Sequence, residues 1–472
     1  MQITLFKPAS PILYQEHKQP MASPELMDKE LVRRLNQILI EDPSYWSLPN
    51  RDRRQLAHAL FQYPAMMVPE VQRRLVEVVC QVKPDTTSLY DPFSGSGTAL
   101  VAGMSNGLTC VGQDINPLAI LLARVKTQPF RHKMLLTKVI QVVEKAKADK
   151  SDDIAIYFPG IDKWFREDVQ RELSRLRRSI CQQPEDARPF LWVILAETIR
   201  LTSNDRTSTY KLHARPKEES VDRRLHAIST FEHLATRGCQ DLKAFHDSLV
   251  NSGLMVKRHT YKGQSTIVLA NTQEVAFNAL EAGKKYDLLV TSPPYGDNLT
   301  TVPYGQHSYL ALNWIDLADI DPKIDASLLN TTHEIDRRSL GGSVDQKQIG
   351  EIVNALSAQS VTLGAVVDQL AESTVKGAVK RIVAFYNDLD KCLDNILPVM
   401  NPNAYMCWTV ANRRVSNVEI PIHTVLTELL ACRNVKLVAT IDRTIHHKRM
   451  PSRNRTADTM KLERILIFRT ND

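Results

Sequence analysis

The 472-residue sequence lacks any paired-cysteine motif, because its seven cysteines are scattered and no two stand in a C-x-x-C spacing. An odd number of cysteines without metal-ligand spacing predicts reduced thiols and no metal site. The sequence has no apolar run long enough to cross a bilayer, and residues 1–20 show no secretory signal pattern. We therefore expect a soluble, cytoplasmic protein without a membrane partner.

Internal repeats and low-complexity tracts are also missing, which excludes solenoid and disordered classes. The sequence is 43% hydrophobic and 24% charged, as is typical of a globular chain with a packed core. Its length predicts a core fold plus a sizeable insertion. The net charge of +7 is compatible with a polyanionic partner but does not identify one.

The pattern from residue 87 onward predicts half of a doubly wound nucleotide-binding unit. A short strand at Thr87–Tyr90 leads into the Gly-rich run Asp91–Thr98, and a helix follows from Ala99 to about Asn106. A second strand begins at Thr109 and terminates at Asp114. Strand, Gly-rich turn, helix, strand and acid in this order indicate an α/β fold with a parallel sheet.

The remaining segments divide the chain into a core and an insertion. Residues 1–60 are read as an N-terminal arm and helix, residues 61–126 and 260–472 as an interrupted core, and residues 127–259 as a helical insertion. Further core strands are expected at 266–269, 287–291, 405–410, 435–441 and 464–468, and further helices at 25–41, 70–82 and 379–397.

The Gly-rich run carries the first chemistry. Gly95 and Gly97 let the backbone approach a ligand closely, and the following helix offers free N–H groups at its N-terminus. A carboxylate at Asp91 repels phosphate and suits a cationic ammonium group instead. Asp114 is placed to accept hydrogen bonds from ribose hydroxyls. These residues predict a site for S-adenosylmethionine, whereas a lone G-x-G is often only a structural turn.

A second motif, Thr-Ser-Pro-Pro-Tyr, ends the strand expected at 287–291. Pro293 and Pro294 donate no N–H and hold their carbonyl groups outward. The exocyclic amine of a base is a poor nucleophile and needs acceptors for its N–H groups during methylation. Ser292 and the Pro293 carbonyl can accept them, and Tyr295 offers a stacking face for an extracted base. The alternative reading is a rigid turn with an exposed tyrosine.

With both motifs in order, the chain resembles the amino-methyltransferases of DNA. The resemblance implies a Rossmann-like class I methyltransferase sheet with a large helical insertion between its cofactor-binding and catalytic halves. It places S-adenosylmethionine against Tyr63, Pro64 and Ala65, and against the loop residues Asp91, Pro92, Phe93, Gly95, Gly97 and Thr98. Asp114 matches the ribose-binding acid. Asn271 stands where family members often carry an acid toward the adenine ring.

The same resemblance implies the substrate. Ser292 before Pro-Pro is common among cytosine-N4 enzymes, whereas adenine-N6 enzymes usually have Asp or Asn there. C5-cytosine methylation is disfavoured because no cysteine follows a proline. The expected partners are double-stranded DNA, with target recognition in the insertion, and a cognate restriction endonuclease unless the enzyme stands alone in its prokaryotic host. An RNA methyltransferase and a catalytically silent scaffold remain as alternative classes.

Basic residues suggest where DNA is held. Arg337 and Arg338 are expected in a basic loop near the flipped base, although a solvated polar loop explains them equally well. The run from His446 to Arg455 is denser, and within it Lys448, Arg449, Arg453 and Arg455 are expected to contact phosphates. In the insertion, residues 206–217 are basic with Tyr210 interleaved.

Overall fold

A seven-stranded sheet organises the protein. The computed structural model describes residues 23–48, 55–128, 132–216, 218–219, 223, 225–257, 260–274, 283–342, 344–373, 377–444 and 462–471. The strand order is β10-β11-β7-β6-β1-β2-β5, and β11 alone runs opposite to the other six strands. The strands are β1 (Ser88–Asp91), β2 (Thr109–Asp114), β5 (Ser265–Leu269), β6 (Tyr286–Thr291), β7 (Met400–Val410), β10 (Lys436–Thr444) and β11 (Leu462–Arg469).

This topology confirms the expected Rossmann-like α/β fold with a mostly parallel sheet. The strand order reverses at β1, which pairs with the next strand along the chain, β2, on one side and with β6 on the other. In open parallel sheets, ligands bind at the carboxyl ends of the strands beside such a reversal. The fold therefore locates the site between β1 and β6, at the strand ends where both predicted motifs begin.

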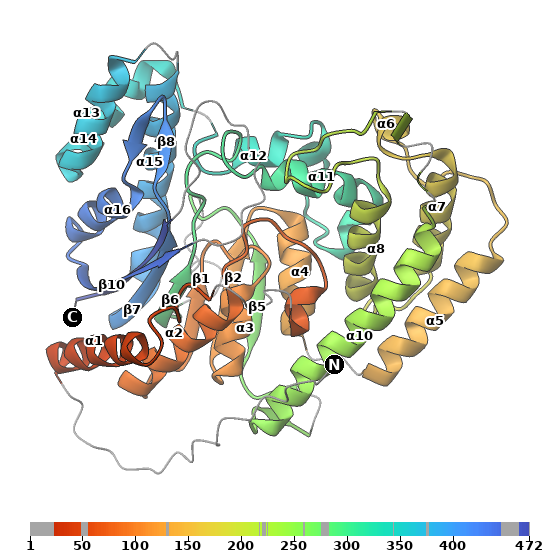
Figure 1. Cartoon of the computed structure of the whole chain (residues 1–472), viewed down its shortest axis with the longest axis horizontal. Coiled ribbons are helices and arrows are strands. Elements are labelled where there is room, and N and C mark those ends of the chain that lie inside the picture. The colour runs from red at the N-terminus through yellow and green to blue at the C-terminus, as the bar shows by residue number, and fades with distance from the viewer. Residues whose placement is uncertain are drawn as a thin grey trace.

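Residues of each strand alternate between two buried faces. Leu89 and Leu288 belong to one apolar cluster, whereas Tyr90 and Leu289, their immediate neighbours, belong to another. The first face is covered by α2 (Pro69–Val82), α3 (Thr98–Ser105) and α4 (Pro117–Thr127), and the second by α14 (Val361–Ala371), α15 (Ala378–Ile396) and α16 (Ile422–Ala431) (Figure 1). Two helical layers thus enclose the sheet.

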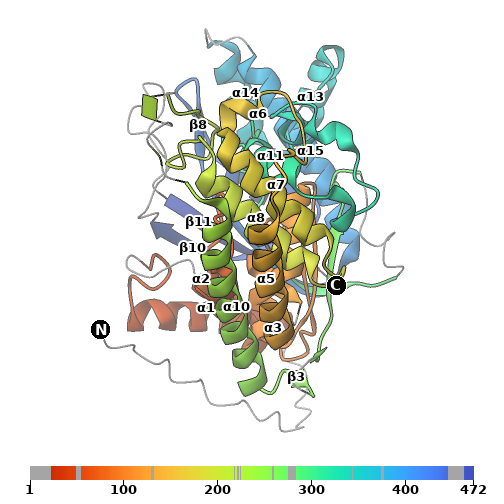
Figure 2. The same cartoon turned by 90° about the vertical axis from the view of Figure 1, so that its right-hand side faces the viewer.

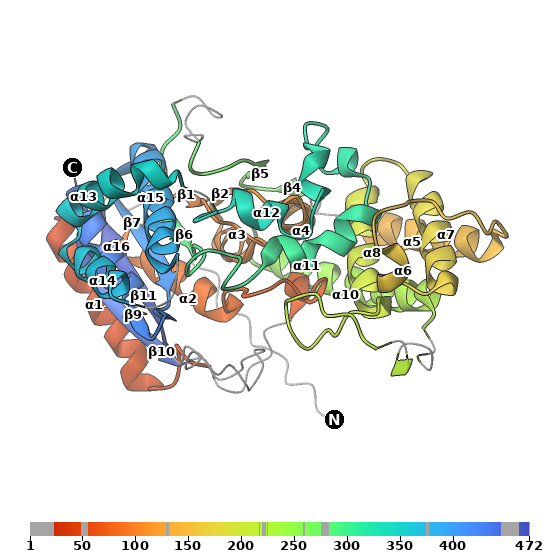
Figure 3. The same ribbon diagram turned by 90° about the horizontal axis from the view of Figure 1, so that it is seen from above.

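The inserted helices stand at one end of the molecule, beyond β5 and α4 (Figures 1 and 3). They are α5 (His132–Ala148), α6 (Ile161–Trp164), α7 (Glu167–Cys181), α8 (Arg188–Thr202) and α10 (Ala227–Asn251). Helices α5, α7 and α10 lie side by side at this end (Figure 2). Residues 190–199 of α8 are all buried, so this helix forms the centre of the helical group.

Further elements lie outside these layers. The other helices of the described residues are α1 (Pro24–Glu41), α11 (Tyr304–Trp314), α12 (Glu334–Arg338) and α13 (Ile349–Gln359). Two small ribbons pair β3 (Met255–Val256) with β4 (Thr260–Tyr261) and β8 (Arg413–Val415) with β9 (Val418–Ile420). Single 3₁₀ turns lie at Leu56–Ala59, Leu317–Asp319, Ala326–Leu329, Gln346–Gln348 and Leu397–Val399. Within the described residues, no helix is both long and apolar enough to span a bilayer.

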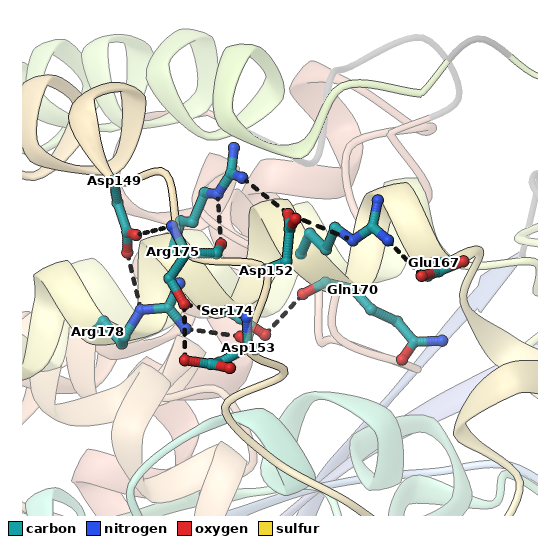
Figure 4. Close-up of polar contacts among 10 residues, drawn as sticks. Asp149, Asp152, Asp153, Glu167, Gln170, Ser174, Arg175 and Arg178 are labelled. Atoms are coloured by element: carbon teal, nitrogen blue, oxygen red, sulfur yellow. Dashed lines mark hydrogen bonds and ion pairs between the residues drawn. The ribbon is translucent and has the colours of Figure 1, made fainter.

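An ion-pair network holds the connector after α5 against α7 (Figure 4). Arg178 contacts the Asp149 carboxylate at 2.8 Å and donates to the carbonyl oxygen of Asp153 at 2.8 Å. Arg175 reaches Asp152 at 3.4 Å. Because the Asp152 side chain is 71% exposed, its pairing with arginine contributes little free energy.

A buried ion pair ties the N-terminal helix to the sheet. Arg469 on β11 contacts Asp28 on α1 with Nε–Oδ1 at 2.9 Å, and both side chains are buried. The Tyr405 hydroxyl donates to the same carboxylate oxygen at 3.1 Å, and Lys436 reaches the other oxygen at 3.0 Å. One carboxylate thus joins α1 to three strands.

We predict that Asp28→Ala lowers the free energy of unfolding by about 3 kcal/mol, because it leaves the Arg469 guanidinium buried without its main partner. The matched change Asp152→Ala should cost less than about 1 kcal/mol, because that carboxylate is exposed. Chemical unfolding of both variants followed by circular dichroism measures the difference. Equal losses would contradict the role assigned to the buried pair.

Candidate active site

The carboxyl ends of the central strands open on a cavity. It brings together most of the residues singled out in the sequence, although they come from five separate segments. These are Tyr63, Pro64 and Ala65 before α2, then Pro92, Phe93, Gly95 and Thr98 after β1, Asp114 at the end of β2, Asn271 after β5, and Ser292 and Pro294 after β6. Asp91, Gly97, Pro293 and Tyr295 are not among the lining residues.

Packing against α4 requires a glycine at position 97. It precedes α3 with φ +78°, and a Cβ built on it would stand 3.0 Å from the Cβ of Ala123 on α4. Gly95, with φ +47°, does line the cavity, and its missing Cβ would contact the Tyr63 ring at 3.5 Å. The ligand-binding role of both glycines stays a prediction, and packing against Ala123 is a further reason for glycine at position 97.

Asp91 lies behind the Gly-rich loop instead of facing the cavity. Its Oδ1 accepts hydrogen bonds from the Thr291 hydroxyl at 2.6 Å and from the Phe93 N–H at 3.2 Å. Its Oδ2 is buried and has no hydrogen-bond partner among the described residues. Burial raises the pKa of Asp91 to about 7, and the nearby Asp114 charge adds to the rise. The structure gives no support to direct contact between Asp91 and a bound ammonium group.

Asp114 faces the cavity while accepting two backbone hydrogen bonds. Oδ2 accepts from the Gly95 N–H and Oδ1 from the Asn116 N–H, both at 2.8 Å. Burial raises the pKa of Asp114 to about 6, although these hydrogen bonds oppose the rise. A carboxylate held in this way orients its remaining lone pairs toward the cavity, as a ribose diol requires.

Helix α11 contributes residues that the sequence did not single out. The Asn116 amide donates to the Tyr63 hydroxyl at 3.1 Å and to Ser308 Oγ at 2.8 Å. The Tyr63 ring stacks on Tyr304 of α11, with centroids 5.8 Å apart and planes at 28°. Tyr304 itself lines the cavity. Two aromatic rings therefore form one wall, a contact between segments about 240 residues apart that no local pattern could reveal.

The cavity combines unsatisfied polar atoms with apolar surface. Ser94 Oγ, Ser96 Oγ and Asn298 Oδ1 belong to lining residues, are buried, and have no hydrogen-bond partner in the described part of the chain. A buried polar atom without a partner costs about 1–3 kcal/mol, so these atoms point to a polar ligand. Met66, Met67 and Leu340 supply apolar walls. An amino-acid-bearing nucleoside such as S-adenosylmethionine fits this mixture.

The Pro-Pro-Tyr loop presents Ser292 and Pro294 to the cavity, but it turns the Tyr295 hydroxyl away toward β11. Ser292 Oγ donates to the Tyr295 hydroxyl at 3.2 Å, and that hydroxyl donates to Glu463 Oε1 at 3.3 Å. Burial, followed by the Glu463 charge, raises the pKa of Tyr295 well above its usual value. Tyr295 therefore remains a protonated donor at neutral pH.

A buried ion pair fixes the chain just after this loop. Arg413 on β8 contacts Asp297 with Nη1–Oδ2 at 3.3 Å, and both side chains are almost fully buried. The same carboxylate accepts the Thr300 N–H through Oδ1 at 3.0 Å. Gly296 has φ +139°, and a Cβ on it would overlap Arg413 Nη1 at 1.6 Å. Only glycine therefore admits this arginine against the loop.

Among the described residues, the arginines predicted to contact DNA are paired with carboxylates. Arg337 pairs with Glu334 at 3.1 Å, and Arg338 pairs with Glu334 and with Asp325, both at 2.9 Å. Both arginines lie on α12, beside Ile335 of the cavity wall. Lys448, Arg449, Arg453 and Arg455 lie outside the described residues. No group of three metal-ligating side chains occurs among the residues that the structure describes.

A basic loop of the insertion packs against α11, the helix that carries Tyr304 of the cavity wall. Backbone bonds from Arg206 N–H to the His213 carbonyl and from Arg215 N–H to the Asn204 carbonyl, both 2.8 Å, close residues 204–215 into a narrow loop. Tyr210 in this loop packs edge-on against His307 of α11, with centroids 5.8 Å apart. The loop exposes Arg206, Lys211 and His213 close to the helix that carries Tyr304.

Comparison with known proteins gives two relatives among curated sequences. The chain is 31% identical over 442 residues to the type II methyltransferase M.MvaI of Kocuria varians, covering 90% of this chain and 92% of that protein. It is 29% identical over 119 residues to the type II methyltransferase M.MjaII of Methanocaldococcus jannaschii, covering 25% of this chain and 22% of that protein. No protein-family model matches.

Among solved structures, the rRNA methyltransferase aviRa of Streptomyces viridochromogenes aligns with 87% of this chain and 88% of its own. The sequence identity is 11% and the TM-score 0.27, a likeness too weak to support any conclusion.

We predict that Asp91→Asn stabilises the unliganded fold at pH 8 by roughly 2 kcal/mol, and that this gain fades toward pH 4. The folded-state pKa of Asp91, about 7, lies above the ordinary value of 3.8. The folded protein therefore holds the proton more tightly than the unfolded chain, and the wild type loses stability as pH rises from about 4 to 7. Thermal unfolding at pH 5 and pH 8 measures the effect.

Asp287→Asn is the matched control with the opposite sign. Burial opposes ionisation of Asp287, but hydrogen bonds from Thr87, Ser88 and Asn401 outweigh it and hold the pKa of this carboxyl below its usual value. Its stabilising effect is present at neutral pH and is lost only in acid, so Asp287→Asn should destabilise at pH 8. A pH-independent difference for Asp91→Asn would contradict its raised pKa.

Proposed function

Because this chain belongs to the family of type II methyltransferases, we propose that it methylates the exocyclic amine of a base flipped out of double-stranded DNA. The favoured position is N4 of cytosine, and the proposed methyl donor is S-adenosylmethionine. One observation carries the proposal: the Gly-rich loop with Asp114 and the Ser-Pro-Pro-Tyr loop, about 180 residues apart, line the same cavity.

The donor half of the cavity suits a nucleoside carrying an amino acid. Asp114 is positioned for ribose hydroxyls. The Ser94 and Ser96 hydroxyls, which have no hydrogen-bond partner among the described residues, are available to the polar amino-acid portion. Asn271 and Phe93 line the remaining wall, where an adenine ring needs an amide partner and an apolar face. When bound, S-adenosylmethionine supplies an electrophilic methyl group on sulfur.

The acceptor half lies at Ser292. The lone pair of an exocyclic amine is delocalised into the base, so the amine becomes a nucleophile only as its N–H bonds are polarised by acceptors. Ser292 Oγ, which lines the cavity, is such an acceptor. The Pro293 carbonyl is proposed as the second acceptor, although Pro293 is not among the lining residues, and neither proline can donate a competing N–H. Direct transfer to nitrogen needs no covalent intermediate on the enzyme, consistent with a loop that carries no cysteine.

The choice between cytosine and adenine rests on Ser292. Ser before Pro-Pro is common among cytosine-N4 enzymes, whereas adenine-N6 enzymes usually have Asp or Asn there, and this resemblance favours cytosine N4. Adenine N6 is the second candidate, because the names of the two curated relatives do not distinguish the two bases. RNA is less favoured, since both curated relatives are type II methyltransferases.

The loop of residues 204–215 is the proposed DNA contact of the insertion. It exposes basic side chains and is attached to α11 by the Tyr210–His307 contact and by a 3.1 Å hydrogen bond from the Leu212 N–H to Gln306. DNA with a base in the cavity would therefore pass close to this loop. A cognate restriction endonuclease acting on the same DNA sequence is the proposed biological partner.

We predict N4-methylcytosine in the DNA of cells that express the wild-type chain and its absence in cells expressing Ser292→Ala. Mass spectrometry of digested nucleosides measures both bases. The purified variant should bind S-adenosylhomocysteine within about twofold of wild type, because Ser292 acts on the base. N6-methyladenine would retain the enzyme class but overturn the cytosine assignment, and RNA methylation alone would overturn the DNA substrate.

We predict that Lys211→Ala weakens binding to duplex DNA and lowers the slope of log affinity against log salt by about one, because one phosphate contact is lost. Lys133→Ala is the control. Lys133 is exposed near the start of α5. The nearby Leu135 lines a small hollow together with Met104 at the end of α3. This hollow lies at the edge of the sheet opposite to the carboxyl ends of the strands, where the cavity is. Fluorescence anisotropy at several salt concentrations measures both variants, and equal slopes would remove the loop from the DNA surface.

A further inference from the structure

We propose that Glu463 on β11 is a positioning residue that makes Ser292 an obligate hydrogen-bond acceptor toward the base amine. The inference rests on the proposed function, and it assigns a role in that function to the last strand of the sheet. Its basis is a chain of three side chains in which Ser292 contacts Tyr295 at 3.2 Å and Tyr295 contacts Glu463 at 3.3 Å.

The direction of this chain follows from the chemistry of its last member. An ionised carboxylate has lone pairs but no proton, so it can only accept. The Tyr295 hydroxyl has a single proton and must donate it to Glu463, which leaves only its oxygen lone pairs to meet Ser292. The Ser292 hydroxyl must therefore donate its single proton to the Tyr295 oxygen.

The consequence falls on the face of Ser292 that lines the cavity. With its proton directed at Tyr295, Ser292 Oγ turns only lone pairs toward the cavity, which is what an incoming N–H requires. If the chain ran the other way, the Ser292 proton would point into the cavity and oppose the amine. The carboxylate on β11 thus selects the reactive arrangement before any base arrives.

Glu463 is held in place from its other side. Arg443 on β10, its partner across the β10–β11 ladder, contacts the second carboxylate oxygen. Arg443 is 3% exposed, and its Nε donates to the carbonyl oxygen of Trp46 at 3.0 Å. A guanidinium has hydrogen-bond donors only. The side-chain atom of residue 463 that contacts Arg443 must therefore be an acceptor.

This second contact makes Glu463→Gln a sharp test. The glutamine amide has nearly the shape of the carboxylate but carries one acceptor and one donor. Because Arg443 takes the acceptor oxygen, the amide nitrogen must face Tyr295 and donate to it. Tyr295 would then donate to Ser292, and the Ser292 proton would be turned into the cavity.

The experiment is a double-mutant cycle of Glu463→Gln and Tyr295→Phe, with kcat and the KM for a duplex substrate measured for purified proteins. We expect Glu463→Gln to lower kcat roughly tenfold, with the KM for DNA and the affinity for S-adenosylhomocysteine unchanged. In the Tyr295→Phe background the chain is already cut, and Glu463→Gln should change kcat less than about twofold.

Two results would overturn the inference while the wild type remains active. One is a wild-type kcat in Glu463→Gln, and the other is an equal loss with and without the Tyr295 hydroxyl, which marks a structural role. If Glu463→Gln fails to fold, Tyr295→Phe alone keeps the Glu463–Arg443 pair and the ring, and a wild-type kcat there overturns the chain. A wild type that methylates neither base overturns the proposed function itself.

Discussion

The site depends on one buried hydrogen bond between neighbouring strands. Thr291, the last residue of β6, donates to Asp91, the last residue of β1, at 2.6 Å. The Gly-rich loop begins immediately after Asp91, and the Ser-Pro-Pro-Tyr loop begins immediately after Thr291. This bond therefore fixes the starting points of both loops relative to one another. The positions of the cavity residues on the two loops depend on it.

The surroundings explain why the two loops keep this geometry. The prolines restrict the backbone of the second loop, and the buried Arg413–Asp297 pair fixes the chain that leaves it. Asp114 fixes the first loop by accepting the Gly95 N–H. Positioned groups of this kind stabilise a developing charge without rearranging during the reaction, so rigidity here serves chemistry as well as stability.

The sequence predicts those features of the fold that depend on residues close together in the chain. Strand boundaries agreed to within a few residues, except at the start of β7, because buried strands between turn residues carry a strong local pattern. The cavity residues of both motifs were found for the same reason. The packing of Gly97 against Ala123 on α4 was not predicted, because it depends on a contact between two separate helices.

The residues that were missed belong to long-range contacts. Glu463 and Tyr295 are 168 positions apart, and Tyr304 meets Tyr63 only because α11 folds back over the strand ends. A lone acid in a strand and a tyrosine in a helix carry no pattern that distinguishes them from solvated or core residues. The positions of Glu463 and Tyr304 in the site depend on the order of the strands in the sheet. The sequence implied that order only through its resemblance to a family.

The same long-range packing bears on how the proposed recognition region is connected to the chemistry. Apolar residues of α5, α7, α8 and α10 belong to one continuous cluster with the first face of the sheet. Polar contacts reinforce this: Arg177 donates to the Trp314 carbonyl at 3.0 Å, and the Trp192 indole N–H donates to Asp319 at 2.7 Å. Helix α11 links the two regions, because it carries Trp314 at one end and the cavity residue Tyr304 at the other. The loop of residues 204–215 is therefore held at a fixed distance from Ser292. A sequence-specific enzyme needs such a fixed distance between the residues that recognise DNA and the residues that act on the base.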